Sequence, residues 1–281
     1  MRKTAALLLL LLAPLARAGS LEAAAARRDA DFSGGAPMVA HVIVALCDNA
    51  SQGIVPVPAR LGNGDDPNSN LYWGAMYGVR GWFRRSPDWR SIPVAASKDA
   101  RVLERALYRR EIIRDGKRGE ILLLAEAWQG EHIEDAIRHF LEINRGEHVE
   151  SLVVGDQREE FGGAAHVAVF VGHNGLMDFE APSLPRSAVR APAHASVVLA
   201  CMSNHYFSPL LAEHSVPLLT TSGLMAPEAY TLDAALSSWF AGRSPQDVRR
   251  AAAAAYAKHQ KTSERASLRL FVAPATDAGL D

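Results

Sequence analysis

The chain has 281 residues, with 30 lysines and arginines against 31 aspartates and glutamates, and no cluster of basic residues. This balance argues against nucleic acid as a partner, because binding to phosphates needs a basic patch. Beyond the first residues, no apolar stretch approaches the roughly 20 residues that cross a bilayer, so we expect no membrane span.

Residues 1–18 have the pattern of a secretory signal peptide. A basic start is followed by an apolar run over residues 5–12 and by small residues at 16 and 18. This pattern predicts cleavage after Ala18 and a periplasmic or secreted protein. The segment carries three basic residues and no acid, so cleavage changes the net charge from −1 to −4. The remainder has the size of one large domain.

The start of the mature chain is irregular in pattern. Residues 19–38 are rich in Ala, Arg and Gly and predict a mobile leader, after which residues 39–281 form a single domain. His41–Leu46 reads as the first strand. Residues 50–97 then form a long insertion rich in Pro and Gly, with a short amphipathic helix expected within 71–79. Such an insertion is either a lid or rim over a functional site, or a flap whose aromatic residues cover the core.

Strands and helices alternate in the rest of the chain. This alternation predicts an α/β fold, a three-layer α/β/α sandwich around a mostly parallel sheet. The expected helices are 98–114, Glu131–Asn144, Glu228–Phe240 and a capped helix from Pro245 to His259; the expected strands are Glu120–Ala125, Val167–Val171, Val197–Ala200, Val216–Thr221 and an edge strand Leu268–Val272.

Two of these strands are each followed by a reactive side chain. Val167–Val171 precedes His173, and Val197–Ala200 precedes Cys201. If the two strands are parallel neighbours, both side chains lie at the sheet edge where α/β folds place their chemistry. A thiol beside an imidazole is suited to be a nucleophile with its base. The turn Gly172-His173-Asn174-Gly175 offers backbone N–H groups for an oxyanion hole.

These residues resemble a known clan. The segments VFVGHNG and VVLACMS, and the order of strands and helices around them, are similar to the caspase-like fold of caspases, legumain, gingipains and the CHAT proteases. Residues 216–260 resemble the CHAT-type continuation with its Gly-Arg-Ser-Pro turn. The resemblance covers residues 40–47 and 98–260 and leaves the insertion unmatched. Two features depart from the clan: Asn174 follows the histidine where the clan has Gly, and the residues after Cys201 lack the usual acidic or Thr-containing sequence.

The resemblance implies an activity and roles for two residues. Cys201 would be the nucleophile and His173 the base of a cysteine peptidase that works through a thioester acyl-enzyme. No cofactor is implied, and the substrate would be a peptide or protein. The recognised residue and the oligomeric state are left open.

Several other residues are candidates for the same site. Asp48 and Asn49, at the end of the first strand, and Ser203 are candidate rim or substrate contacts, although an Asp in this position often caps a turn. Asp178 and Glu180 read as solvated loop acids. The other histidines near Cys201 in sequence, His194 and His205, and the alternative nucleophiles Ser203 and Ser222 are further options, but neither serine has the Gly-x-Ser-x-Gly pattern.

A second hypothesis concerns the two cysteines. An exported protein with Cys47 and Cys201 as its only cysteines would by default join them in a disulfide. The protein would then be a non-enzymatic periplasmic α/β binding protein. The ten histidines are scattered and the cysteines are far apart in sequence, so the sequence predicts no metal site.

Overall fold

The computed structural model describes residues 20–275, and its centre is one eight-stranded mixed sheet. The predicted signal peptide and its cleavage site lie outside the described residues. The strand order is β10-β9-β8-β7-β1-β4-β3-β2, and β5 with β6 forms a separate hairpin. The strands are β1 Met38–Ala45, β2 Arg90–Ile92, β3 Val102–Arg114, β4 Lys117–Trp128, β5 Glu150–Val154, β6 Gln157–Phe161, β7 Val167–Val171, β8 Ala195–Leu199, β9 Val216–Thr221 and β10 Phe271–Val272.

The central five strands are parallel. β1 pairs with β4 on one side and β7 on the other, and β7, β8 and β9 follow in parallel. The antiparallel strands β10, β3 and β2 lie toward the two edges. An α/β fold with a mostly parallel sheet, as the sequence predicted, is therefore confirmed. The apolar, β-branched runs form these central strands because both faces of the sheet are buried.

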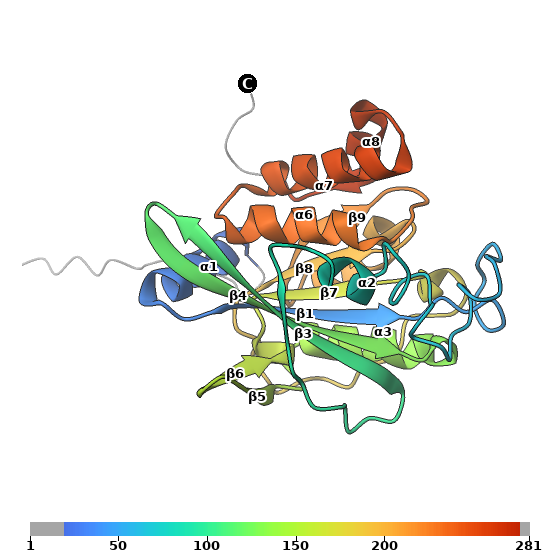
Figure 1. The fold of residues 1–281 in the computed structure, drawn as a ribbon, viewed down its shortest axis with the longest axis horizontal. Helices are drawn as coiled ribbons and strands as arrows, with labels where there is room; N and C mark the ends of the chain where they lie inside the picture. Colours follow the sequence, from blue (N-terminus) through green and yellow to red (C-terminus); the bar gives the residue numbers. More distant parts are fainter. Residues whose placement is uncertain (1–19, 276–281) are drawn as a thin grey trace, which may run out of the picture.

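Helices cover both faces of the sheet (Figure 1). Side chains along β1 alternate between the faces: Val42 and Val44 belong to the core that includes Trp239, whereas Ile43 belongs to the core that includes Phe140. The helices are α1 Leu21–Gly34, α2 Val79–Phe83, α3 Ile133–Asn144, α4 Ser203–Tyr206, α5 Ser208–Leu211, α6 Ala229–Phe240, α7 Pro245–Gln260 and α8 Glu264–Leu270, with 3-10 turns at Gly130–His132, Gly162–Ala164 and Gly175–Met177.

The prediction of a helix over residues 98–114 is wrong. Residues 102–114 form β3, which pairs antiparallel with β4 in a long hairpin. The turn between them is Asp115-Gly116, and both residues have positive φ, 50° and 76°. An Asp-Gly pair with these angles is the standard two-residue hairpin turn. The hydrogen bonds to β4 override the helical spacing of apolar residues, so the first helix of the caspase-like order is replaced by a strand.

The mobile leader expected over residues 19–38 is corrected as well. Residues 21–34 form α1, capped by the Ser20 side chain, and β1 begins at Met38. Arg28 of α1 is buried, donates a hydrogen bond to Trp239 O (3.0 Å) and stacks on the Trp239 ring. Arg27 donates to the carbonyl oxygens of Ala164 and Ala165. These polar contacts fix a segment whose composition alone suggested no fixed position.

Two further boundaries differ from expectation. The short helix expected within 71–79 is a series of turns, and α2 begins only at Val79. Of the expected edge strand, Phe271 and Val272 pair with β9, while the preceding residues belong to α8. Among residues 20–275, no helix has both the length and the apolar composition to cross a membrane.

Candidate active site

His173 and Cys201 line one cavity at the carboxyl ends of two neighbouring strands. β7 and β8 are parallel, with Val171 opposite Leu199, so the turns that follow them meet at one edge of the sheet. This juxtaposition is the one predicted from the sequence. The cavity measures about 290 Å³, and its lining comes from three parts of the chain: Gly53, Ile54, Val55 and Tyr72 of the insertion, Gly172, His173, Met177 and Cys201 of the two turns, and Leu224, Met225 and Pro227 after β9.

Asp178 is the partner of His173, and sequence reasoning missed it. Nε2 of the buried imidazole lies 2.7 Å from Asp178 Oδ2. The same carboxylate oxygen accepts a hydrogen bond from the backbone N–H of Gly53 (3.0 Å). Asp178 is an exposed loop acid, as expected, but its carboxylate is also the hydrogen-bond partner of His173 and Gly53. Because the carboxylate occupies Nε2, Nδ1 is the ring nitrogen left to take a proton.

The Cys201 thiol is held by backbone groups of the loop after β9. The N–H of Met225 donates to Sγ (3.4 Å), and Sγ lies 3.6 Å from Met225 O. Met202, the next residue, has a left-handed φ of 51°, which turns the chain sharply into α4. Among the described contacts, Sγ has no hydrogen bond to His173. A cysteine and its base often come closer only when the substrate is bound.

The turn after β7 is stabilised by its own hydrogen bonds. The buried Asn174 side chain donates to Cys201 O (2.7 Å) and accepts from Leu176 N (3.2 Å), so it joins the histidine turn to the cysteine turn. The N–H of Gly172 donates to Leu199 O, and that of Gly175 donates to His173 O. These two N–H groups are already used within the protein. The expectation that Gly172 and Gly175 contribute to an oxyanion hole is not supported by this geometry, and among the described contacts only the N–H groups of His173 and Asn174 remain of the predicted set.

The insertion reaches the cavity through a buried asparagine. The Asn70 side chain accepts hydrogen bonds from the N–H groups of Cys47 and Tyr72 and donates to the carbonyl oxygens of Cys47 and Asn63. This anchors the insertion on the end of β1 and places Tyr72 in the cavity lining. In Figure 1 the first loops of this segment, in blue, lie at the end toward which β1 points.

The two cysteines are free thiols, so the Cys47–Cys201 disulfide of the alternative hypothesis is not present. Cys47 is fully buried, and burial raises the pKa of its thiol to about 11. Cys47 is therefore a protonated, unreactive residue beneath the insertion, whereas Cys201 is partly exposed at the cavity.

The three predicted rim residues do not line this cavity. Asp48 accepts hydrogen bonds from Ala50 N and Ser51 Oγ, the turn-capping role. Asn49 closes a loop through two hydrogen bonds with Val57. Ser203 is buried and donates to Val198 O, so it is a structural residue.

The alternative partners and nucleophiles also lie elsewhere. His194 is buried before β8, where it contacts Pro192 O and Asn144 Oδ1. His205 packs on the Tyr206 ring. The hydroxyl of Ser222 donates to Arg269 O. None of these three side chains belongs to the lining of the cavity.

The cavity mouth is apolar and exposed. Val55 is 87% exposed, Leu224 73% and Met177 41%, which is unusual for such side chains. Clustered exposed apolar residues around a concave site are typical of a binding surface. No acidic or basic residue other than His173 is part of the lining among the described residues.

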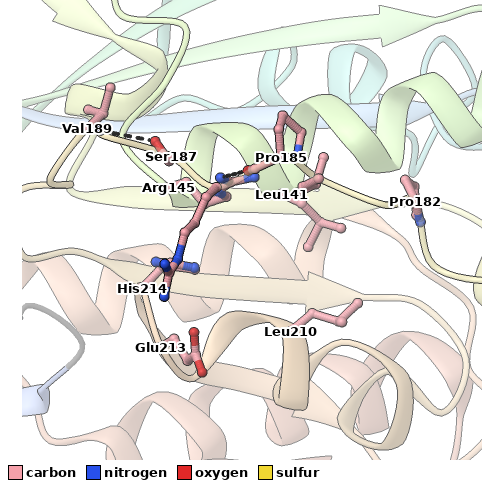
Figure 2. A pocket seen from close by; sticks show the side chains of 11 residues that line it. Leu141, Arg145, Pro182, Pro185, Ser187, Val189, Leu210, Glu213 and His214 are labelled. Carbon is pink, nitrogen blue, oxygen red and sulfur yellow. Dashed lines mark hydrogen bonds between the residues drawn. The ribbon is translucent and has the colours of Figure 1, made fainter.

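A second cavity, of about 500 Å³, lies away from this chemistry (Figure 2). It is bordered by Leu141 and Arg145 at the end of α3, by the segment 182–189, and by Leu210, Glu213 and His214. It contains neither cysteine nor His173. Of these two cavities, only the smaller one is lined by Cys201 and His173.

Comparison with protein-family models, with curated proteins and with solved structures finds no match to this chain.

Proposed function

We propose that this protein is an exported cysteine-dependent hydrolase, a peptidase with the three-layer, caspase-like arrangement that the sequence resembles. Cys201 is the nucleophile, His173 is the base, and Asp178 positions the imidazole. One observation carries the proposal: His173 and Cys201 follow neighbouring parallel strands and line the same apolar cavity, with a carboxylate on Nε2 of the imidazole.

The chemistry follows from the protonation of these groups. Nδ1 of His173 takes the thiol proton, and the Cys201 thiolate attacks the carbonyl carbon of the scissile amide. The C–N bond then breaks, and the imidazolium returns its proton to the leaving amine. A water molecule, deprotonated by His173, hydrolyses the thioester and restores the thiol. Throughout, Asp178 stabilises the imidazolium and keeps Nε2 protonated.

The lining of the cavity indicates the class of substrate. It offers apolar surface from Ile54, Val55, Leu224 and Met225 and no fixed charge that would pair with an acidic or basic side chain. We therefore expect an uncharged, apolar residue to occupy it. Its volume of about 290 Å³ accommodates one large side chain.

Alkylation of the two cysteines tests the proposal. Iodoacetamide should modify Cys201 rapidly below neutral pH, and peptide mapping should show Cys47 unmodified. His173→Ala should slow the reaction of Cys201. Cys47→Ala is the matched control: it removes the other thiol and should leave the rate at Cys201 unchanged. Equal rates with and without His173 would contradict the proposed dyad and favour a non-enzymatic binding protein.

Cleavage of a proteome-derived peptide library tests activity and substrate class together. Wild-type protein should cut it, and Cys201→Ala and His173→Ala should not. Because the two residues act as a unit, the double variant should lose no more activity than Cys201→Ala alone. A preference for charged residues at the cleavage site would contradict the apolar substrate class but not the role of the cysteine.

A further inference from the structure

Two histidines and a glutamate come together on a face of the molecule that the proposed peptidase chemistry does not use. His139 and Glu142 lie on α3, and His148 follows in the turn after the helix. The potential ligand atoms of the three side chains all lie within 4.8 Å of one another. The sequence predicted no metal site because its histidines are scattered, but the fold brings two of them to one carboxylate.

The turn that delivers His148 is tightly fixed. Gly146 and His148 have positive φ, 84° and 55°, so the chain reverses immediately after α3. A Cβ added to Gly162 would lie 1.9 Å from His148 O, which shows how closely the two backbones approach. In this position His148 Nε2 lies 2.8 Å from Glu142 Oε2. The backbone of the turn therefore already holds His148 beside Glu142.

His139 is backed by a buried carboxylate. Its Nε2 lies 3.9 Å from Oε2 of Glu126, which is only 5% exposed. One face of the imidazole packs on Trp128, with ring centroids 5.0 Å apart, and the His148 ring lies 4.7 Å away. Histidines that bind metals commonly direct their second nitrogen at a carboxylate, which fixes the ring and increases its basicity. At 3.9 Å the Glu126 carboxylate does not hydrogen-bond to His139, and it lies closer to His41 and Arg105, but its charge faces the imidazole.

We propose that His139, Glu142 and His148 bind one first-row divalent cation, of which Zn²⁺ is the representative. Two imidazoles and one carboxylate are a donor set typical of zinc, whereas Mg²⁺ and Ca²⁺ prefer oxygen ligands alone. Ligand atoms around tetrahedral zinc are separated by about 3.3 Å, so modest side-chain rotations complete the site. The His148 side chain, 48% exposed, is free to make them. The fourth position is left to water.

The site would act as a clamp. A cation held by these three side chains joins the last turn of α3 to the segment that leads into β5. This role does not depend on the proposed peptidase activity, since none of the three residues lines the cavity of Cys201.

Cation binding tests the proposal directly. The protein, purified without a histidine tag and carrying Cys201→Ala so that the thiol offers no ligand, is titrated with Co²⁺ and then Zn²⁺. Calorimetry should find one high-affinity ion per chain, Co²⁺ should develop visible absorption bands that Zn²⁺ abolishes, and the melting temperature should rise with Zn²⁺ but not with Mg²⁺.

Substitutions locate the ion. His148→Ala and Glu142→Gln, both at partly exposed positions, should each weaken binding at least tenfold and remove the thermal shift. His132→Ala is the matched control, because His132 also contacts carboxylates, those of Asp135 and Glu131, near the start of the same helix but has no second histidine beside it. Absence of binding, or affinity unchanged in both test variants, would overturn the proposal.

Discussion

Replacing Asp178 with asparagine isolates the contribution of the carboxylate to the candidate dyad. The side chain keeps its size but loses its charge, and the hydrogen bond to His173 Nε2 (2.7 Å) becomes neutral. Hydrogen bonds to charged groups contribute about 1.5–3 kcal/mol. The Asp178 side chain is 34% exposed, so solvent screening reduces this to about 1–2 kcal/mol. We therefore expect the thiolate–imidazolium pair to be less stable by that amount.

The rate of Cys201 alkylation measures this effect. A loss of about 1–2 kcal/mol corresponds to a rate lower by roughly 5- to 30-fold below neutral pH. Measured across pH, the profile should shift as well as fall, which a purely structural role of Asp178 would not produce. Glu180→Gln is the matched control, since this neighbouring acid is also exposed but has no described contact with His173. The same rate in both variants, within twofold, would refute the positioning role of Asp178.

Three further predictions concern stability and substrate binding. Burial lowers the pKa of His194 to about 4 in the folded protein. Below about pH 6.5 this histidine therefore binds a proton in the unfolded protein but stays neutral in the folded protein. The contribution of His194 to stability is therefore present above pH 6.5 and falls by about 3 kcal/mol toward pH 4. Urea unfolding of His194→Gln should lack this component, and the same pH slope in the variant and the wild type would contradict it. Asn70→Ala removes four hydrogen bonds, three of them buried, and should cost about 3–4 kcal/mol in chemical denaturation; a cost below about 1 kcal/mol would show that the insertion is anchored otherwise. Val55→Ser and Leu224→Ser should raise KM for apolar peptides several-fold with little change in kcat or melting temperature, whereas unchanged KM would exclude this surface from substrate binding.

The sequence alone was sufficient to predict the central strands and the position of His173 and Cys201 at one edge of the sheet. Short β-branched runs are local patterns, and strands buried on both faces have few alternatives. Once such strands are parallel neighbours, their following residues must share an edge. The amphipathic stripe of α3 and the capping box of α7 were readable for the same reason, since each lies within one segment.

The remaining features of the fold and of the two sites depend on contacts between segments that are far apart in the sequence. Residues 102–114 have helical spacing but form β3, because hydrogen bonds to β4 outweigh a weak local preference. The long-range partners of polar side chains carried no local signal: Asp178 reads like any loop acid until the fold sets it against His173 and Gly53. The clustering of His148 with His139 and Glu142 likewise arises from one backbone turn after α3. Apolar periodicity records which face of an element is buried, but the partner of a polar side chain is fixed only when distant segments are packed together.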